Sequence, residues 1–386
     1  MSKGDRDQSH YDVVIVGASF AGLVCARTAA MRGLKVCVLE AKADPGARMH
    51  TTGILVKEAA DEVDLPHTLM RRVHGVRLYA PSLSSIDLFA PGSYFLTTRT
   101  ADIVRWLAQE ATRAGATIMC GARFSGAERD GERIRIGSHG LRARYLVGAD
   151  GARSSVAECF GLGRNTRFLT GIEAEYDQLA GVDPRFLHCF IDAATAPGYI
   201  GWIAPGPDVM QVGLAVKKGR KPDLGGFLAR TGGLFDYDRA TVVEKRSGRI
   251  PCGGLVHPLA APGVILIGDA AGLVSPMTGG GIRLAFRFGR RAAQAISDHL
   301  LDCGPSPERV LAREYPKFRL KKLLRAGLDL TPPNPLVDFG ISSALMRKLA
   351  TRIYFHRSGA AGESFRDFER RIRDRVPGAT RPAPWP

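Results

Sequence analysis

The sequence predicts an α/β fold with an inserted antiparallel sheet and a helical C-terminal region. Three observations lead to this prediction. The first forty residues alternate between short apolar strand patterns and a helical pattern, with glycines where the pattern changes. Residues 170–241 consist of short alternating segments broken by Gly, Pro and Asp. Helical spacing then occupies residues 282–301 and parts of the chain beyond 305.

The first forty residues form one strand–helix–strand unit. Residues 11–16 are the apolar run YDVVIV, which ends at Gly17. Helix-forming residues follow from 20 to 32, and Gly33 closes that helix. The second apolar run, LKVCVLE, occupies residues 34–40 and ends on an acid. This order of strand, glycine turn, helix and strand is typical of a parallel nucleotide-binding sheet.

Later segments are expected to extend the same sheet. Residues 117–120 and 145–147 are candidate strands, and residues 103–114 have the apolar spacing of a helix. Residues 264–267 form a further apolar strand, which the helix of residues 282–301 follows. The parallel sheet is therefore expected to be interrupted by the antiparallel segment and to resume after it.

The charged residues are mostly basic, with 54 Lys plus Arg against 38 Asp plus Glu and a net charge of +16. Charge of this sign favours nucleic acid, an anionic membrane surface or an acidic small molecule. No RNP-like or zinc-finger motif accompanies the scattered arginines, so we expect a solvated basic surface and no nucleic-acid partner. The seven cysteines lack CxxC or His-rich spacing, which argues against a metal site.

The hydropathy pattern bears on location. No apolar run reaches the roughly 18 residues that a spanning helix needs, and the first ten residues lack the apolar core of a secretory signal. We therefore expect a cytoplasmic protein. Residues 346–357, MRKLATRIYFHR, alternate basic and apolar side chains. This pattern fits an amphipathic helix packed on the body, and it also fits a peripheral contact with an anionic membrane.

The glycine turn after the first strand carries the first chemical motif. Residues 17–22 read GASFAG, a GxGxxG-type loop in which Ser19 replaces the middle glycine. The helix that follows presents free amides and a positive dipole to a pyrophosphate, and Glu40 is placed to accept hydrogen bonds from ribose hydroxyls. The alternative is a glycine-rich turn beside an exposed Glu. The expected cofactor-binding residues of the loop are Gly17, Ala18, Ser19, Ala21 and Gly22.

Two further glycine-rich segments lie downstream. Residues 148–154 read GADGARS, where the Asp150-Gly151 pair taken alone predicts only a turn. Residues 268–282 read GDAAGLVSPMTGGGI. Asp269, at the end of a strand, is suited to ribityl or ribose hydroxyls, and the amides of residues 279–282 can face an anion. A reduced flavin carries negative charge on its pyrimidine side, so a helix N-terminus there would stabilise the reduced state.

Taken together in this order, the three motifs resemble those of FAD-dependent oxidoreductases with the para-hydroxybenzoate hydroxylase fold. The resemblance covers residues 11–300 and implies a Rossmann-type FAD-binding domain. It implies that Glu40 binds the adenosine ribose and that Arg99 lies near the pyrophosphate. It further implies that Asp269 holds the ribityl chain, that Gly281 and Ile282 meet the isoalloxazine, and that Asp150 is tied to FAD through structure.

Within that family the chain resembles the geranylgeranyl reductase branch. The segment from 268 to 282 is similar to its flavin loop, and residues 201–205, GWIAP, are similar to its tryptophan–proline substrate motif. Ile200 stands where that motif has Tyr, Ala204 stands where it has Phe, and Thr51 and Thr52 occupy a place where these reductases often carry Cys. The pocket over the flavin is therefore expected to differ from theirs. A halogenase would share such a tryptophan motif, but no catalytic lysine can be placed.

These features predict three regions and a set of pocket residues. The FAD-binding domain comprises residues 11–75, 97–165 and 255–304, the substrate domain comprises 76–96 and 166–254, and residues 305–386 form a helical C-terminal region with a flexible tail. Trp202 and Tyr199 are expected either to wall the substrate pocket or to pack in the sheet core. Arg48 and His50 are expected either to line the flavin or substrate entrance or to lie in a surface loop.

The resulting functional hypothesis is a FAD-dependent oxidoreductase that transfers hydride to a carbon–carbon double bond of an apolar, isoprenoid substrate. NADPH or NADH is the expected electron donor; because only one nucleotide fingerprint is present, it would dock transiently, unless a carrier protein delivers the electrons. One alternative is an NAD(P)H-dependent flavin monooxygenase that hydroxylates its substrate. A second is a non-catalytic flavin-binding redox module.

Overall fold

The apolar runs of the first forty residues form the centre of a parallel sheet. The computed structural model describes residues 10–341 and 343–355. In it β1 (His10–Val16) lies between β2 (Val36–Glu40) and β11 (Leu141–Gly148), parallel to both. The sheet continues with β18 (Val264–Leu266) beyond β11 and β8 (Thr117–Cys120) beyond β2, again in parallel. The strand order reverses at β1, so the carboxyl edge of the sheet has its switch point there.

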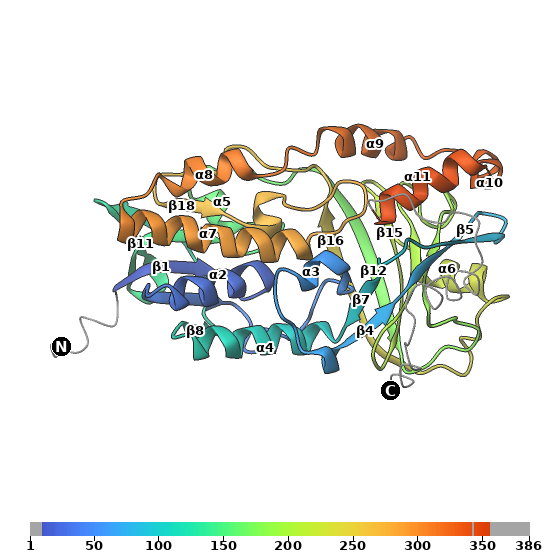
Figure 1. Ribbon diagram of the computed structural model, residues 1–386, viewed down its shortest axis with the longest axis horizontal. Helices are drawn as coiled ribbons and strands as arrows, with labels where there is room; N and C mark the ends of the chain where they lie inside the picture. Colours follow the sequence, from blue (N-terminus) through green and yellow to red (C-terminus); the bar gives the residue numbers. More distant parts are fainter. Residues whose placement is uncertain (1–9, 342, 356–386) are drawn as a thin grey trace, which may run out of the picture.

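Helices cover this sheet because their apolar faces match it. The helix α2 (Phe20–Met31) is buried along most of its length, whereas α4 (Thr100–Arg113) and α7 (Ile282–Asp302) bury one face each. A Cβ atom added to Gly289 of α7 would lie 2.5 Å from the carbonyl oxygen of Ala21, so this glycine lets α7 pack closely on α2. Figure 1 shows these helices with the parallel sheet on one side of the molecule.

A second, seven-stranded sheet forms the other side of the molecule (Figure 1). Its strands in spatial order are β16 (Val242–Pro251), β12 (Phe168–Tyr176), β15 (Met210–Lys217), β14 (Gly201–Pro205), β13 (Phe186–Phe190), β5 (Gly75–Tyr79) and β6 (Ser85–Leu88). All neighbours are antiparallel except β13 and β5, which are parallel. The expectation of a purely antiparallel sheet is wrong at this pair, because β5 comes from a distant part of the chain and no hairpin sets its direction.

Several smaller elements were not predicted from the sequence. A three-stranded sheet consists of β3 (Ile54–Val56), β7 (Phe95–Thr98) and β4 (Met70–Val73). The hairpin of β9 (Ala127–Asp130) and β10 (Arg133–Ile136) extends β11, and β17 (Ala260–Ala261) pairs with β18. The short helical segments are α3 (Lys57–Ala60), η1 (His67–Leu69), η2 (Gly137–His139), α5 (Ser155–Cys159), α6 (Leu224–Thr231) and η3 (Gly268–Ala271).

In the described part of the chain, four helices follow α7. They are α8 (Pro307–Glu314), α9 (Arg319–Asp329), α10 (Asn334–Ile341) and α11 (Ala344–Phe355). The helical character expected beyond residue 305 is therefore present as far as Phe355. Residues 356–386, at the end of the chain where a flexible tail is expected, lie outside the described residues. Within the described ranges, no helix is both long and apolar enough to cross a membrane. The three domain boundaries remain a prediction.

Candidate active site

Three loops that are far apart in the sequence meet at the carboxyl edge of the parallel sheet. Gly17 follows β1, and a Cβ atom placed on it would lie 2.4 Å from the carbonyl oxygen of Ala149, which follows β11. Gly268, near the end of β18, lies against α2, where an added Cβ atom would come within 2.9 Å of the Ala21 Cβ atom. The three motifs therefore surround the N-terminus of α2 at the switch point, where sheets of this kind bind ligands.

The glycine loop leaves backbone amides unpaired at the start of α2. Gly17 has a φ of +104°, which strongly favours glycine. Ser19 is the N-cap residue and makes no side-chain capping bond, and the first helical bond runs from the Leu23 amide to the Ser19 carbonyl at 2.9 Å. The helical amides that precede Leu23 therefore have no partner within the helix, and they can receive an anionic oxygen.

Glu40 lies at the end of β2, beside this loop, and its side chain is buried. One carboxylate oxygen accepts the Ala18 amide at 2.8 Å, and the other accepts the Lys42 amide at 2.9 Å. The carboxylate thus holds the glycine loop against the segment that follows β2. Its predicted contact with a ribose would use the lone pairs that remain.

Asp150 has a structural role that its turn motif did not predict. One oxygen of its carboxylate accepts the amides of Ser155 at 2.6 Å and Val156 at 3.1 Å, at the start of α5. The other oxygen is buried and has no partner among the described residues. Its Cα atom lies 3.1 Å from a Cβ atom placed on Gly17, so Asp150 adjoins the glycine loop.

Asp269 lies close to the loop before α7. A Cβ atom on Gly281 would lie 3.5 Å from an oxygen of the Asp269 carboxylate, and Ile282 is the first residue of α7. Part of Asp269 is accessible to water. The protein atoms packed around its carboxylate nevertheless desolvate it, and this burial raises the pKa of Asp269 to about 6. No described residue donates a hydrogen bond to it, so it remains available to hydroxyl donors of a ligand.

Two basic side chains add positive charge to that of the helix dipole at the N-terminus of α7. Arg283, in the first turn, has a buried Nε atom without a hydrogen-bond partner among the described residues. The pKa of Lys321 on α9 is lowered by burial and, to a smaller extent, by the charge of Arg283. Two cations near a helix N-terminus favour negative charge on a bound ligand.

Arg99, Arg48 and His50 are less closely tied to these loops. Arg99 precedes α4 and forms an exposed ion pair with Asp208. It lines a cavity of about 240 Å³ that also contains Arg246 of β16. Arg48 is exposed with a φ of +47°, and the exposed His50 makes a 2.9 Å contact from its Nδ1 atom to the Ser247 carbonyl oxygen. This contact fastens the loop after β2 to the second sheet.

Trp202 belongs to a row of residues that crosses the second sheet. Arg246 of β16 is paired with Glu173 of β12, Glu173 with Gly213 of β15, and Gly213 with Trp202 of β14. Because Gly213 has no side chain, the indole lies over it; an added Cβ atom would come within 2.7 Å of the ring. The indole Nε1 atom then donates to the Glu173 carboxylate at 2.7 Å.

Two further groups donate to Glu173, which is only 4% exposed. The Arg246 Nε atom donates to one oxygen at 2.7 Å, and the hydroxyl of Thr52 donates to the other at 2.6 Å. Thr52 belongs to the loop after β2, so the network connects the parallel-sheet side of the molecule to the second sheet. A buried carboxylate held by three donors fixes both the indole and the loop.

Tyr199 and Trp202 also share an apolar cluster with Ile250, packed on Leu169, Ala215 and Cys252. The Tyr199 hydroxyl donates to the Thr278 carbonyl oxygen at 2.6 Å, and burial raises the pKa of this phenol well above its usual range. A Cβ atom on Gly279 would lie 2.7 Å from the Tyr199 hydroxyl and 3.4 Å from Ile250. The aromatic wall of the second sheet therefore touches the glycine-rich loop that leads into α7.

Comparison with known proteins agrees with this arrangement. Residues 10–223 match the model of a family described as FAD binding domain. The chain belongs to this family of FAD-dependent oxidoreductases. It is 31% identical over 325 residues to a digeranylgeranylglycerophospholipid reductase of Methanothrix thermoacetophila, an alignment that covers 78% of this chain and 82% of the relative.

Solved structures share the fold. A geranylgeranyl bacteriochlorophyll reductase-like protein from Thermoplasma acidophilum has a TM-score of 0.77 at 22% identity, covering 95% of this chain and 100% of the other. The flavin-dependent brominase Bmp2 has a TM-score of 0.68 at 19% identity, covering 95% of this chain and 100% of the other. At these identities the likeness concerns the fold alone.

The residues of the described site fit FAD. The flavoprotein offers unpaired amides at the start of α2 for a pyrophosphate, a glycine there that no larger residue can replace, and an unpartnered carboxylate at Asp269 for hydroxyl groups. The cationic N-terminus of α7 suits the negative charge of a reduced flavin. When bound, FAD supplies the two-electron carrier that the protein itself lacks.

Sequence reasoning missed the network around Glu173. In the segment GIEAEY, Glu173 and Glu175 are two positions apart, a spacing that places both side chains on one face of a strand. Nothing local shows that this face is buried, or that Arg246 and Trp202 lie in the same row, because strand register over such distances depends on the whole sheet. Two acids at alternate positions of one strand pattern were the available signal.

We predict that Asp269→Asn changes the pH dependence of stability in the flavin-free protein. The folded pKa of about 6 exceeds the roughly 3.9 of an unfolded Asp, so ionisation opposes folding, and stability is lost as pH rises from about 4 through 6. The melting temperature of the wild type should therefore fall relative to Asp269→Asn over this range. Asp44→Asn is the control of opposite sign, because Arg105 lowers the pKa of Asp44. If the difference in melting temperature between the wild type and Asp269→Asn does not vary with pH, the raised pKa assigned to Asp269 is wrong.

We also predict that Gly213→Ala displaces the indole of Trp202 and breaks its bond to Glu173. Overpacking and the lost donor should lower the free energy of unfolding by about 1–3 kcal/mol and change the fluorescence assigned to Trp202 by difference from Trp202→Phe. Gly171→Ala in the neighbouring β12 is the matched control, since its added Cβ atom would meet its nearest neighbour at 3.7 Å. Equal effects of the two substitutions would show that the row does not depend on Gly213.

Proposed function

We propose that this flavoprotein reduces a carbon–carbon double bond of an apolar, isoprenoid substrate. The observation that carries the proposal is the contact between the aromatic cluster and the flavin-side loop: Tyr199 donates to the Thr278 carbonyl oxygen, and both Tyr199 and Ile250 adjoin Gly279. An apolar wall at this position would hold a hydrocarbon against the reacting face of the cofactor. On this proposal the second sheet is the substrate domain.

The polar groups behind that wall form hydrogen bonds with one another. The Glu173 carboxylate takes hydrogen bonds from Trp202, Thr52 and Arg246, so it has little remaining demand for a polar substrate. Its role in the proposal is to position the indole and the loop after β2, on either side of the substrate. A hydrocarbon chain suits such a site, since it would neither compete for these bonds nor leave a polar group unpaired.

The cofactor half of the proposal assigns Glu40, the loop of residues 17–22, Arg99 and Asp150 to the nucleotide side. Asp269, Gly281 and Ile282 are assigned to the flavin side. Saturating one double bond consumes one hydride and one proton. The hydride would come from reduced FAD, the proton from a side chain or water, and NADPH or NADH would restore the two electrons by docking transiently.

The name of the relative from Methanothrix thermoacetophila supports a reductase, and its identity to this chain extends over most of both proteins. The substrate need not be the same. Ile200 is half-buried and Ala204 is fully buried, and both pack in the cluster that contains Trp202. The space around these two side chains is therefore shaped differently from the space that a Tyr and a Phe would need.

The test separates reduction from hydroxylation. Flavin-loaded protein is reduced anaerobically by light and then mixed with geranylgeraniol or a geranylgeranyl lipid. We expect reoxidation of the flavin and a product heavier by two hydrogens per bond, without oxygen. Trp202→Ala should slow this reoxidation by roughly 10–100-fold while flavin content is unchanged, because the substrate loses its positioning surface.

Two results would overturn the proposal. Oxygen-dependent hydroxylation without any anaerobic saturation would favour the monooxygenase. Absence of both reactions, with neither NADPH nor NADH oxidised, would favour a flavin-binding redox module.

A further inference from the structure

Exposed apolar side chains are concentrated on the three helices after α8. Thirteen large apolar side chains are exposed among the described residues, and eight of them lie between residues 320 and 349. They belong to α9, α10, α11 or the turn after α9. These eight, here called the leucine face, are Leu320, Leu323, Leu330, Leu336, Phe339, Leu345, Met346 and Leu349. Such a concentration of exposed apolar side chains on consecutive helices favours an interaction site.

The polarity of α9 is inverted relative to an ordinary surface helix. Leu320 and Leu323 point outward at 68% and 70% exposure, whereas Arg325 is completely buried. The Arg325 guanidinium pairs with Asp329 at 2.5 Å and donates to the Gly198 carbonyl oxygen. These partners compensate the buried cation. Exposing the two leucines to water is unfavourable unless another apolar phase covers them.

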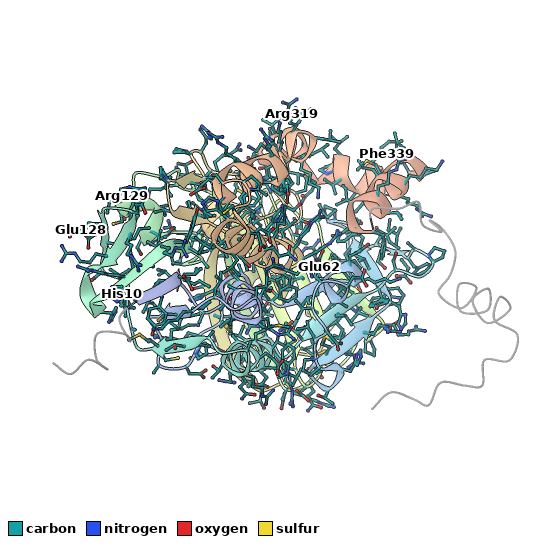
Figure 2. All side chains as sticks on the ribbon, turned by 60° about the vertical axis from the view of Figure 1, so that its left-hand side comes forward. His10, Glu62, Glu128, Arg129, Arg319 and Phe339 are labelled. Atoms are coloured by element: carbon teal, nitrogen blue, oxygen red, sulfur yellow. The ribbon has the colours of Figure 1, made fainter. Side chains whose placement is uncertain are left out.

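The charge around the leucine face is basic. Residues 319–355 contain seven Lys or Arg and two Asp. Both Asp side chains are occupied: Asp329 pairs with Arg325, and Asp338 accepts the Ser82 amide at 2.8 Å. Four exposed cations, Arg319, Lys322, Lys348 and Arg352, pair with no acid among the described residues. Figure 2 shows Arg319 and Phe339 on the outer edge of the molecule, on neighbouring helices.

We propose that the leucine face docks on an anionic lipid bilayer. Exposed apolar side chains beside unpaired cations complement a membrane surface, where the apolar groups enter the acyl boundary and the cations meet lipid phosphates. The contact is peripheral, since none of the described helices is suited to cross a bilayer. The inner side of α9 contacts Gly198, the neighbour of Tyr199, so the docked face and the aromatic cluster lie on opposite sides of one helix.

The proposed docking depends only on the exposed residues of the leucine face. Its test therefore needs no substrate and is independent of the proposed reaction. The full flavin-loaded chain is floated with vesicles of phosphatidylcholine, with and without phosphatidylglycerol. We expect the protein to float with the anionic vesicles and to be released by high salt. Leu323→Ser/Phe339→Ser should lower the partition coefficient about tenfold or more, because burying one such side chain contributes at least a tenfold factor.

The matched control is Met31→Ser/Val243→Ser, which removes two apolar side chains of 67% and 58% exposure outside the leucine face. It should float like the wild type. Failure of the wild type to bind anionic vesicles would overturn the proposal, as would equal binding of both double variants. A dimer in light scattering that Leu323→Ser/Phe339→Ser dissociates, without vesicle binding, would assign the face to a second copy of the chain. If the protein floats with anionic vesicles but does not reduce a double bond, the proposed function fails and the proposed membrane contact does not.

Discussion

The close approach of Gly17 to Ala149 is the constraint on which the cofactor side depends. It brings the turn after β1 against the turn after β11, and only a residue without a side chain permits it. The same contact region places Asp150 beside the loop and leaves the start of α2 open. Because Gly268 approaches α2 in a similar way, three segments of the chain converge on a few backbone atoms of one helix N-terminus.

A second glycine, Gly213, determines where the Trp202 indole lies on the second sheet. Gly213 allows the Trp202 indole to cross β15 and reach Glu173, and Glu173 in turn holds Thr52 of the loop after β2. The two sheets are therefore joined through a buried, hydrogen-bonded carboxylate as well as through apolar packing. Removing one partner of such a network costs more than the bond itself, because the remaining charge stays buried. On the proposed function, this network would hold the aromatic cluster in place over the flavin.

The sequence predicted what local periodicity controls. The strand 117–120 and the helix beginning at 282 occupy their expected positions, and the motifs containing Gly17, Asp150 and Asp269 are brought together. The parallel pairing of β13 with β5 and the row from Arg246 to Trp202 were not predictable, because they depend on contacts between distant strands. The ion pair of Arg99 with Asp208 was missed for the same reason.

The central claim is that the carboxyl edge at β1 binds FAD, with the nucleotide at the start of α2 and the flavin between Asp269 and the aromatic cluster. A crystal structure of the flavin-loaded protein tests it most directly. The account predicts the pyrophosphate at the amides of residues 19–22 and the isoalloxazine beside Gly281 and Ile282, within reach of Tyr199 and Trp202. A flavin bound instead in the cavity of about 310 Å³ beside Arg153, Asn165 and Arg249 would contradict it.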